Sequence, residues 1–363
     1  MKTAHINAGN EIGGGLAHIV SLLEALKEEK IDLIVFEEGP VAEAARKAGI
    51  PVYVFEQKHQ FDLSVLHRLR TFIFEQDYAL LHTHGPRANS LIALLKPFLT
   101  ASWIMTVHSH PVLDFKDRGL KGKIFEAIHK RTFKKADGII AVSSEIKAFL
   151  TSQGVAAERI KVIHNGIRFL RSTASPRMKD PDTFTLITVG RLTWVKGYDI
   201  LMETLNELKL KDWRWVVCGD GEAMIELKTK GEKYDLMHRI DFKGWLSAHE
   251  LRQELSQADL FVLPSLSETF PLVLLEAADE KIPAVATDVG DVSEVIKDPE
   301  AGWLIPPGSR GALKEALLEA YSLWENDHLK EKGERLNAFA SGFSIEEQSR
   351  AVWAFYKEIM TKT

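Results

Sequence analysis

Residues 260–277 have the sequence LFVLPSLSETFPLVLLEA, and this stretch decides the fold. Its first four residues are apolar and have the length and composition of a buried strand. A short polar loop follows, and the apolar residues from Leu272 onward have the spacing of a helix, which we expect over residues 272–280. We expect Pro271 at the first helical position, where its missing N–H would have no partner anyway. The stretch therefore predicts a strand that leads through a loop into a helix.

The same alternation of short apolar runs and helical periodicity extends outward over the whole chain. Strands that alternate with helices form parallel sheets with helices on both faces, the doubly wound arrangement. Ligands of such sheets bind beyond the carboxyl ends of the strands. Strands are expected at residues 4–6, 33–36, 52–55, 80–83, 103–107, 138–142, 161–163, 185–189, 215–218, 240–242, 260–263 and 284–286, and helices at residues 16–26, 63–75, 144–151, 198–208, 250–257, 272–280 and 344–361.

A polar segment with two prolines, residues 171–183, interrupts the alternation and has the composition of a linker. The length of 363 residues fits two domains. We therefore expect an α/β protein with two Rossmann-like, doubly wound domains that face a central cleft. The first covers residues 1–170 and the second residues 184–343, and a helix follows at residues 344–363.

The composition is that of an ordinary globular protein and excludes several classes. Hydrophobic residues make up 45% and charged residues 27% of the chain. No apolar run reaches the roughly 18 residues of a membrane-spanning helix, and no secretory signal follows Lys2. Cys218 is the single cysteine, which excludes an intramolecular disulfide and a Cys-rich metal cluster. We expect a cytoplasmic protein, and the net charge of -5 without a recognisable binding module argues against nucleic acid as a partner.

Basic residues concentrate in the segment 121–135, together with apolar residues that suit an amphipathic helix. The more common explanation of such a pattern is a solvated helix face. The other is peripheral contact with an anionic acceptor or with the anionic inner face of a membrane. The sequence leaves both explanations open.

Two carboxylates lie eight residues apart on the loop and helix of the opening stretch. Glu268 lies on the loop and Glu276 inside the helix. The free N–H groups and the dipole of a helix N-terminus bind anions, and carboxylates accept hydrogen bonds from sugar hydroxyls. Judged by spacing alone, a surface loop and a surface helix position explain the pair more simply.

Two cations surround a second turn between a strand and a helix. The stretch Gly190–Gly197 contains Arg191 and Lys196, where a diphosphate would lie in such a domain. Arginine binds phosphate in bidentate fashion, and lysine supplies a point charge. Judged alone, two surface cations explain this stretch more simply.

The first half of the chain offers a glycine-rich turn and two histidines at strand ends. Gly13, Gly14 and Gly15 follow the first strand, and glycine permits close approach of the backbone to a ligand. The turn is neither a Walker loop nor a spaced dinucleotide fingerprint. His84 and His108 end two further strands, although a single histidine is more often structural than functional.

Taken together, these motifs resemble glycosyltransferase family four, a family of retaining, nucleotide-sugar-dependent enzymes with the GT-B fold. The resemblance covers most of the chain and is most specific over residues 184–300, where the motifs appear in the family's order. By position it implies donor binding by Gly14, Gly15, Gly190, Arg191, Lys196, Glu268, Phe270, Pro271, Leu272 and Glu276, catalytic roles for His108, Arg191, Lys196 and Glu268, and an acceptor side at His84 and Gly13.

The resemblance also implies roles for the individual groups. Arg191 and Lys196 would hold the donor diphosphate, Glu268 the transferred sugar, and Glu276 the ribose. The base would lie near residues 240–244, and uridine diphosphate is expected before guanosine diphosphate. The helix at residues 344–363 would cross back to the first domain. No cofactor and no essential metal are expected, and the triplet Asp180-Pro181-Asp182 is interpreted as a turn.

One departure and several alternatives remain open. The family commonly has two glycines where this chain has Gly290 and Asp291, which puts the details of that loop in doubt. A nucleotide-sugar epimerase could share the architecture. A nicotinamide dehydrogenase and a non-catalytic partner subunit are disfavoured, the latter because all four motif charges are present. The hydroxyl acceptor is unknown, and a lipid-linked sugar, a polysaccharide and a small metabolite all remain candidates.

Overall fold

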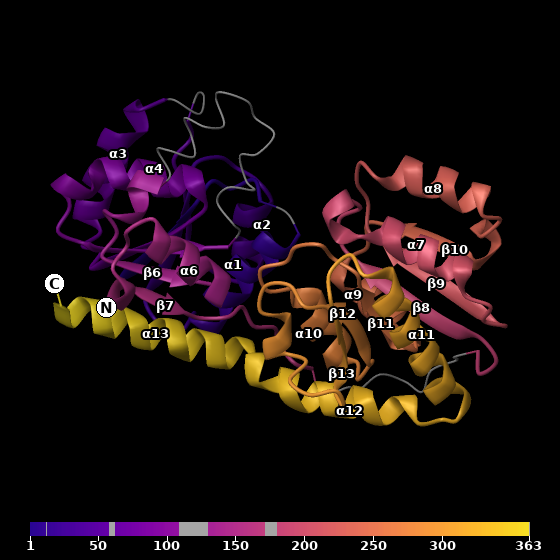
Figure 1. Cartoon of the computed structure of the whole chain (residues 1–363). Coiled ribbons are helices and arrows are strands. Elements are labelled where there is room, and N and C mark those ends of the chain that lie inside the picture. Colours follow the sequence, from indigo (N-terminus) through magenta and orange to yellow (C-terminus); the bar gives the residue numbers. More distant parts are fainter. Residues whose placement is uncertain (12, 58–61, 109–129, 171–179, 363) are drawn as a thin grey trace. The chain divides into compact units, whose positions relative to one another are not determined.

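The computed structural model describes residues 1–11, 13–57, 62–108, 130–170 and 180–362. They form two compact units (Figure 1), one of Met1–Arg168 with Ile345–Thr363 and one of Phe169–Ser344. Residues 171–179 of the expected linker and residues 121–129 of the basic segment lie outside the described residues. Among the described helices, none combines the length and the apolar character that crossing a membrane requires.

The first unit contains a seven-stranded parallel sheet in the order β3-β2-β1-β4-β5-β6-β7. The chain therefore winds from the centre to one edge and then from the centre to the other, which is the doubly wound topology. The strands are β1 (Thr3–Asn7), β2 (Ile31–Val35), β3 (Val52–Val54), β4 (Leu80–His84), β5 (Ser102–Val107), β6 (Gly138–Ala141) and β7 (Ile160–Val162).

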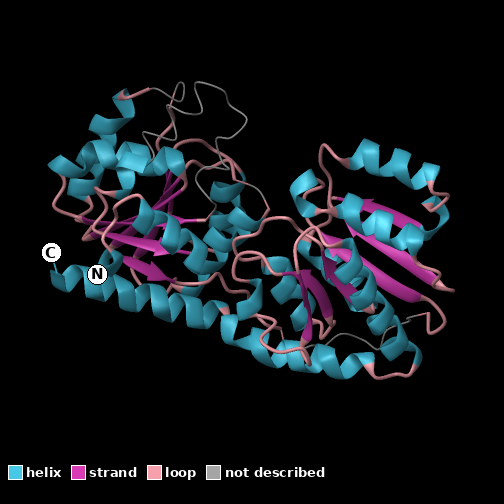
Figure 2. Ribbon diagram, viewed as in Figure 1, coloured by secondary structure: helices cyan, strands magenta, loops and turns pink. Residues whose placement is uncertain are grey.

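Helices cover both faces of this sheet (Figure 2). The last helix of the chain belongs to this unit and packs against α1 and β5. The helices are α1 (Gly14–Ala25), α2 (Pro40–Lys47), α3 (Ser64–Glu75), α4 (Pro86–Leu95), α6 (Ser144–Ser152) and α13 (Ile345–Lys362), with short 3-10 turns η1 (Lys96–Phe98) and η3 (Ala157–Arg159).

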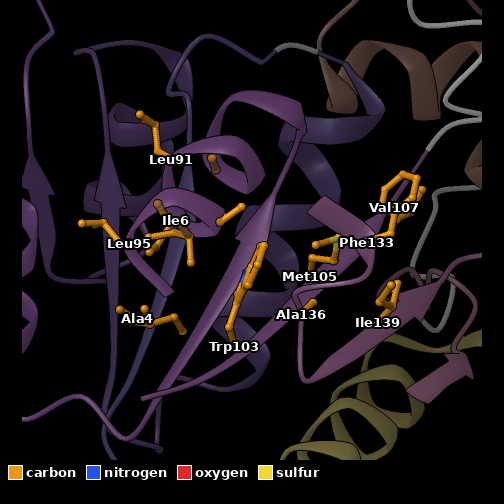
Figure 3. Packing of buried hydrophobic residues seen from close by; sticks show 14 of the residues in the cluster. Ala4, Ile6, Leu91, Leu95, Trp103, Met105, Val107, Phe133, Ala136 and Ile139 are labelled. Atoms are coloured by element: carbon orange, nitrogen blue, oxygen red, sulfur yellow. The ribbon is translucent and has the colours of Figure 1, made fainter. Parts of the chain in front are cut away.

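The two faces of this sheet differ in chemistry. Ala4, Ile6, Trp103 and Met105 project into an apolar core beneath α3, α4 and α6 (Figure 3). Successive side chains of a strand point to opposite faces, so the alternate residues of β1 and β4 project toward α1 and α13. Several of these are histidines, so the second face carries a polar patch inside an otherwise apolar layer.

The second unit contains a six-stranded parallel sheet in the order β10-β9-β8-β11-β12-β13. Its strands are β8 (Phe184–Val189), β9 (Trp213–Cys218), β10 (Ile240–Gly244), β11 (Leu260–Leu263), β12 (Ala284–Thr287) and β13 (Gly302–Ile305). Its helices are α7 (Tyr198–Glu207), α8 (Met224–Lys233), α9 (Ala248–Gln257), α10 (Leu272–Asp279), α11 (Arg310–Glu325) and α12 (Leu329–Ala340), with 3-10 turns η4 (Trp194–Lys196), η5 (Met237–Arg239), η6 (Val292–Glu294) and η7 (Ser341–Phe343).

The predicted fold class, α/β with two Rossmann-like units, is confirmed. Each predicted strand is present, with ends that differ by at most two residues. One local prediction was wrong. Pro271 is the N-cap of α10 and not its first helical residue, because its extended backbone (φ -80°, ψ 109°) turns the chain into the helix at Leu272.

Helix α12 supports α10, whose N-terminus follows the loop that carries Glu268. The side chain of Asn337 donates a hydrogen bond to the carbonyl of Ala278 over 2.9 Å. Gly333 of α12 lies so close to the turn after α10 that an added Cβ would be 1.9 Å from the carbonyl oxygen of Lys281. This close approach of α12 to the turn after α10 fixes the position of α10.

Replacing Gly333 with alanine should therefore destabilise the protein by about 1–3 kcal/mol, the usual cost of overpacking. The matched control is Gly311→Ala in α11, where an added Cβ meets no atom within 4 Å. That control should be neutral or should stabilise by up to about 1 kcal/mol, because alanine is the better helix former. Urea unfolding of both variants checks the prediction, and equal stabilities would contradict it.

Candidate functional site

Glu268 and Lys196 form an ion pair in the second unit. The ammonium of Lys196 donates to Oε1 of Glu268 over 2.5 Å, and the hydroxyl of Ser265 donates to the same oxygen over 2.7 Å. The side chain of Lys196 is 22% exposed and that of Glu268 is 10% exposed. No described residue donates to Oε2 of Glu268, so one carboxylate oxygen is fixed and the other can accept a hydrogen bond.

Two glycines shape the backbone around this ion pair. Gly197 has a left-handed conformation (φ 66°), and a Cβ there would be 2.1 Å from the carbonyl oxygen of Pro264. Gly290 also has a positive φ of 57°, and a Cβ there would be 2.4 Å from the carbonyl oxygen of Glu268. Asp291 then donates its N–H to the carbonyl of Thr269 over 3.1 Å. The single glycine at 290 is thus the one that close packing requires.

Glu276 lies in the second turn of α10 and is partly buried. Burial raises the pKa of its carboxyl, and the charge of Arg252 opposes that shift. Among the described residues, none donates a hydrogen bond to this carboxylate. A desolvated carboxylate without donors suits a ligand that brings hydroxyl groups.

Arg191 follows the carboxyl end of β8 and is exposed. Gly190, with φ 147°, turns the chain there and donates its N–H to the carbonyl of Cys218 over 2.9 Å. Within the described ranges, Arg191 forms no ion pair. Arg191 and Lys196 therefore place two cations on the segment that follows β8, as the motif predicted.

The glycine turn of the first unit forms the start of α1. Gly13 is the N-cap of this helix with φ 64°, and Gly14 and Gly15 are its first two residues. Sequence reasoning missed Glu11, which lies beside this turn: a Cβ at Gly15 would be 2.7 Å from its Oε2. Asn7 donates to Oε1 of Glu11 over 2.9 Å, while burial, the larger effect, raises the pKa of the carboxyl.

His84, which is buried, and His108, which is half-buried, lie together in a larger cluster of imidazoles. Nδ1 of His84 is hydrogen-bonded to Nε2 of His108 over 3.1 Å. His18 of α1 packs edge-on against His108, with ring centroids 4.6 Å apart. Sequence reasoning missed His5, His18 and His82, although the alternation of His82 with His84 along one buried strand was a usable signal. The cluster comprises His5, His18, His82, His84 and His108.

All five imidazoles are neutral near pH 7. Burial lowers the pKa of His5 to about 3 and that of His108 to about 4. For His18, His82 and His84, burial first and then the neighbouring imidazoles hold the pKa well below its ordinary value. Each ring therefore carries one proton, on one of its two nitrogens.

Two groups of three histidines are close enough to hold a metal ion, with nitrogens within 4.8 Å of one another. They are His5, His82 and His84, and His18, His84 and His108. Most of these nitrogens instead hydrogen-bond to one another or to Tyr356 and Thr106. The absence of an essential metal stays a prediction. Asp180 forms a turn, as predicted: it accepts from the N–H of Asp182 and the hydroxyl of Thr183.

Two family models match consecutive parts of the chain. The model described as Glycosyltransferase Family 4 matches residues 12–169, and the model described as Glycosyl transferases group 1 matches residues 174–336. The chain belongs to glycosyltransferase family four.

Relatives of this family-four chain include proteins from bacteria and archaea. A Salmonella typhimurium protein assigned as a colanic acid biosynthesis glycosyltransferase is 30% identical over 210 residues, which are 56% of this chain and 52% of that protein. The chain spans about half the length of the first relatives it matches. An uncharacterized glycosyltransferase of Methanocaldococcus jannaschii is 28% identical over 354 residues, 96% of this chain and 95% of that protein.

The solved structure of the Anabaena protein HepE in complex with UDP has the same fold as this family-four chain. It superimposes with a TM-score of 0.85 over 99% of this chain and 100% of that chain, at 19% identity. The fold is therefore GT-B. None of the proteins named here carries the name of an epimerase, so the epimerase alternative gains no support.

Lowering the pH from 7.5 to 5.5 should reduce the free energy of unfolding. The cluster histidines are neutral when folded but bind protons in the unfolded chain below a pKa of about 6.5. Their contribution is fully present above that pH and is lost as the pH falls toward about 4, by up to about 1.4 kcal/mol per pH unit for each histidine. Urea unfolding at several pH values measures the slope.

The surface variant His249→Gln should show the same acid loss, whereas His84→Asn should show a shallower one. Glu11 and Glu276 act in the opposite direction, since burial raises the pKa of each, but they are two groups against five. A stability that is constant from pH 7.5 to 5.5 would contradict a neutral cluster.

Gly290→Ala should disturb the Glu268 loop, because the new Cβ would meet the carbonyl oxygens of Glu268 and Thr269 at 2.4 and 2.6 Å. The control is Gly308→Ala, which has a similar positive φ of 74° but whose Cβ would meet its nearest atom, in the side chain of Leu266, at 3.8 Å. Gly308→Ala should cost about 1–2 kcal/mol from the left-handed backbone alone. Gly290→Ala should cost more and should also weaken nucleotide binding, measured by calorimetry. Equal losses in both variants would show that the close approach is unimportant.

Proposed function

We propose that this chain is a retaining glycosyltransferase that moves a sugar from a nucleoside diphosphate sugar to a hydroxyl acceptor. The observation that carries this proposal is the grouping of charges at the carboxyl ends of β8 and β11. There, Lys196 fixes Glu268, Arg191 has no ion partner among the described residues, and Glu276 offers a carboxylate without donors. Cations beside carboxylates that can accept hydrogen bonds match a ligand that is part diphosphate and part polyol.

The two cations act on the leaving group. Breaking the bond between the anomeric carbon and the diphosphate places negative charge on the departing phosphate. Arg191, Lys196 and the N-terminus of α10 stabilise that charge by fixed electrostatics. In this proposal they take the role that a divalent metal has in other transferases, so no metal is required.

The state of Glu268 supports a hydrogen-bonding role over a nucleophilic one. One of its oxygens is bound by both Lys196 and Ser265, which lowers the carboxylate's tendency to attack. Retention then follows from a displacement on one face of the sugar, in which the leaving phosphate takes the acceptor's proton as the acceptor oxygen bonds to the anomeric carbon. Isolation of a covalent glycosyl adduct on Glu268 would contradict this mechanism.

The proposal also gives a role to His108, a residue of the first unit. It is neutral near pH 7, because burial lowers its pKa to about 4. A neutral imidazole can donate to or accept from a hydroxyl of the transferred sugar without adding charge next to an electron-poor anomeric centre. His84, Gly13 and the missed carboxylate of Glu11 are proposed for the acceptor side.

The substrates are proposed from relatives. HepE was solved with UDP, which favours a UDP-sugar as donor, with a GDP-sugar second. The Salmonella relative is assigned to the synthesis of a polysaccharide, so a polysaccharide or glycolipid hydroxyl is the proposed acceptor. We also propose that the protein contacts the membrane peripherally.

Calorimetry with UDP, GDP, ADP and NAD, with and without EDTA, tests the donor site. One nucleoside diphosphate should bind, EDTA should not matter, and Arg191→Ala and Glu276→Gln should each weaken binding about 10- to 100-fold, the worth of one charged hydrogen bond. Arg335→Ala, on the exposed face of α12, is the matched control and should bind normally.

Three outcomes would overturn the proposal: binding of NAD alone, binding that depends on a metal, or binding that survives both site variants. Conversion of the bound nucleotide sugar without any acceptor would replace transfer with epimerisation.

A further inference from the structure

A continuous chain of hydrogen bonds runs through the polar side of the first unit and reaches His108. Thr106 is bonded to Nε2 of His82 over 2.6 Å, and Nδ1 of His82 to the hydroxyl of Tyr356 over 2.5 Å. That hydroxyl also contacts Nε2 of His5 over 3.1 Å. Nδ1 of His5 is bonded to Nε2 of His84 over 3.0 Å, and Nδ1 of His84 to Nε2 of His108 over 3.1 Å.

Such a chain has only two proton arrangements. Each neutral imidazole has one N–H and one bare nitrogen, and each hydrogen bond needs one proton, so the choice at one ring dictates the choice at the next. If the bonds are donated toward His108, its Nε2 accepts and its proton is on Nδ1. If they are donated away from His108, its Nε2 carries the proton and its Nδ1 is bare.

We propose that this chain is a positioning network that sets which ring nitrogen of His108 carries its proton, with Tyr356 as its central joint. Tyr356 suits that place because its single hydroxyl can donate to either His5 or His82 while it accepts from the other. It reaches the sheet from α13, 351 residues from His5 along the chain. His82 and Tyr356 are fully buried, and Thr106 is 3% exposed.

The closed far end of the chain argues for positioning over proton conduction. Thr106 is 3% exposed, so a proton taken up at His108 does not reach solvent through that residue. Metal binding would compete with the same nitrogens.

The network matters for the proposed function, on which this part of the inference rests. With the proton on Nδ1, His108 presents a donor beyond the chain, and with Nδ1 bare it presents an acceptor. A sugar hydroxyl or ring oxygen distinguishes these two states. A wrong tautomer leaves binding groups in place and removes one hydrogen bond, which lowers turnover more than donor affinity.

Tyr356→Phe tests the joint, because it removes one oxygen and keeps the ring. In protein with 15N-labelled histidine, the His108 signals, assigned with His108→Asn, should report one tautomer in the native protein. In Tyr356→Phe, Nε2 of His5 has lost its partner, and burying it without a proton costs less free energy than burying an N–H without an acceptor. The bonds should then be donated toward His108, whose proton should lie on Nδ1. Where this moves the proton of His108, turnover should fall about 10-fold with the donor KM within about 3-fold. Tyr78→Phe is the matched control: its hydroxyl donates to Asp32 over 2.6 Å in the same unit but outside the chain.

Thr106→Val tests the far end independently. Without the hydroxyl, burying Nε2 of His82 without a proton costs less free energy than burying an N–H without an acceptor. The proton of His82 should therefore lie on Nδ1. The bonds are then donated toward His108, which should carry its proton on Nδ1. Thr106→Ser keeps the hydroxyl and should keep the native tautomer.

The tautomer signals need no substrate, so they separate this inference from the proposed function. A His108 proton on Nε2 in either Tyr356→Phe or Thr106→Val overturns the network, whatever the activity. The expected proton on Nδ1 in both variants of a protein that transfers no sugar keeps the network and overturns the proposed function.

Discussion

Parallel strands bring their carboxyl ends to one edge of a sheet, and the candidate residues of each unit depend on that constraint. In the second unit, Lys196 and Glu268 follow β8 and β11, which are neighbouring strands of the sheet. In the first unit, His84 and His108 end or follow β4 and β5, which are neighbours as well. Residues far apart in sequence become partners because the strands before them pair in register.

Elements with strong apolar patterns could be predicted from the sequence, and elements with weaker ones could not. Most of the strands are fully or almost fully buried, so their apolar runs identified them. Helices α2, α4, α8, α11 and α12 and strand β13 were not among the expected elements. Helices α8, α11 and α12 are rich in charged residues, and β13 contains a glycine and ends just before two prolines.

The site was predictable where it consists of local motifs. The segments 190–197 and 267–277 each contain their own functional groups, so Arg191, Lys196, Glu268 and Glu276 could be named from spacing and resemblance. The ion pair between Lys196 and Glu268 was not foreseen, because it joins residues 72 positions apart. Most of the imidazole cluster was beyond local reasoning too, since its five histidines come from β1, β4, α1 and the residue after β5, and their meeting depends on the order of the strands in the sheet.

The insertion of Tyr356 into the first unit has a consequence for biosynthesis. Roughly 190 residues separate Arg168, where the first segment of this unit ends, from Tyr356, and synthesis at 5–20 residues per second needs about 10–40 s for that distance. During that interval the nascent chain has exposed the surface of the sheet on which α13 will pack, with three imidazoles still lacking their phenol or helix partners. The first unit is therefore a late-maturing part of a chain whose second unit can fold before it. A ribosome that stalls just after Ser344 holds a chain with a complete second unit and an unfinished first unit, a species that chaperones and proteases would meet first.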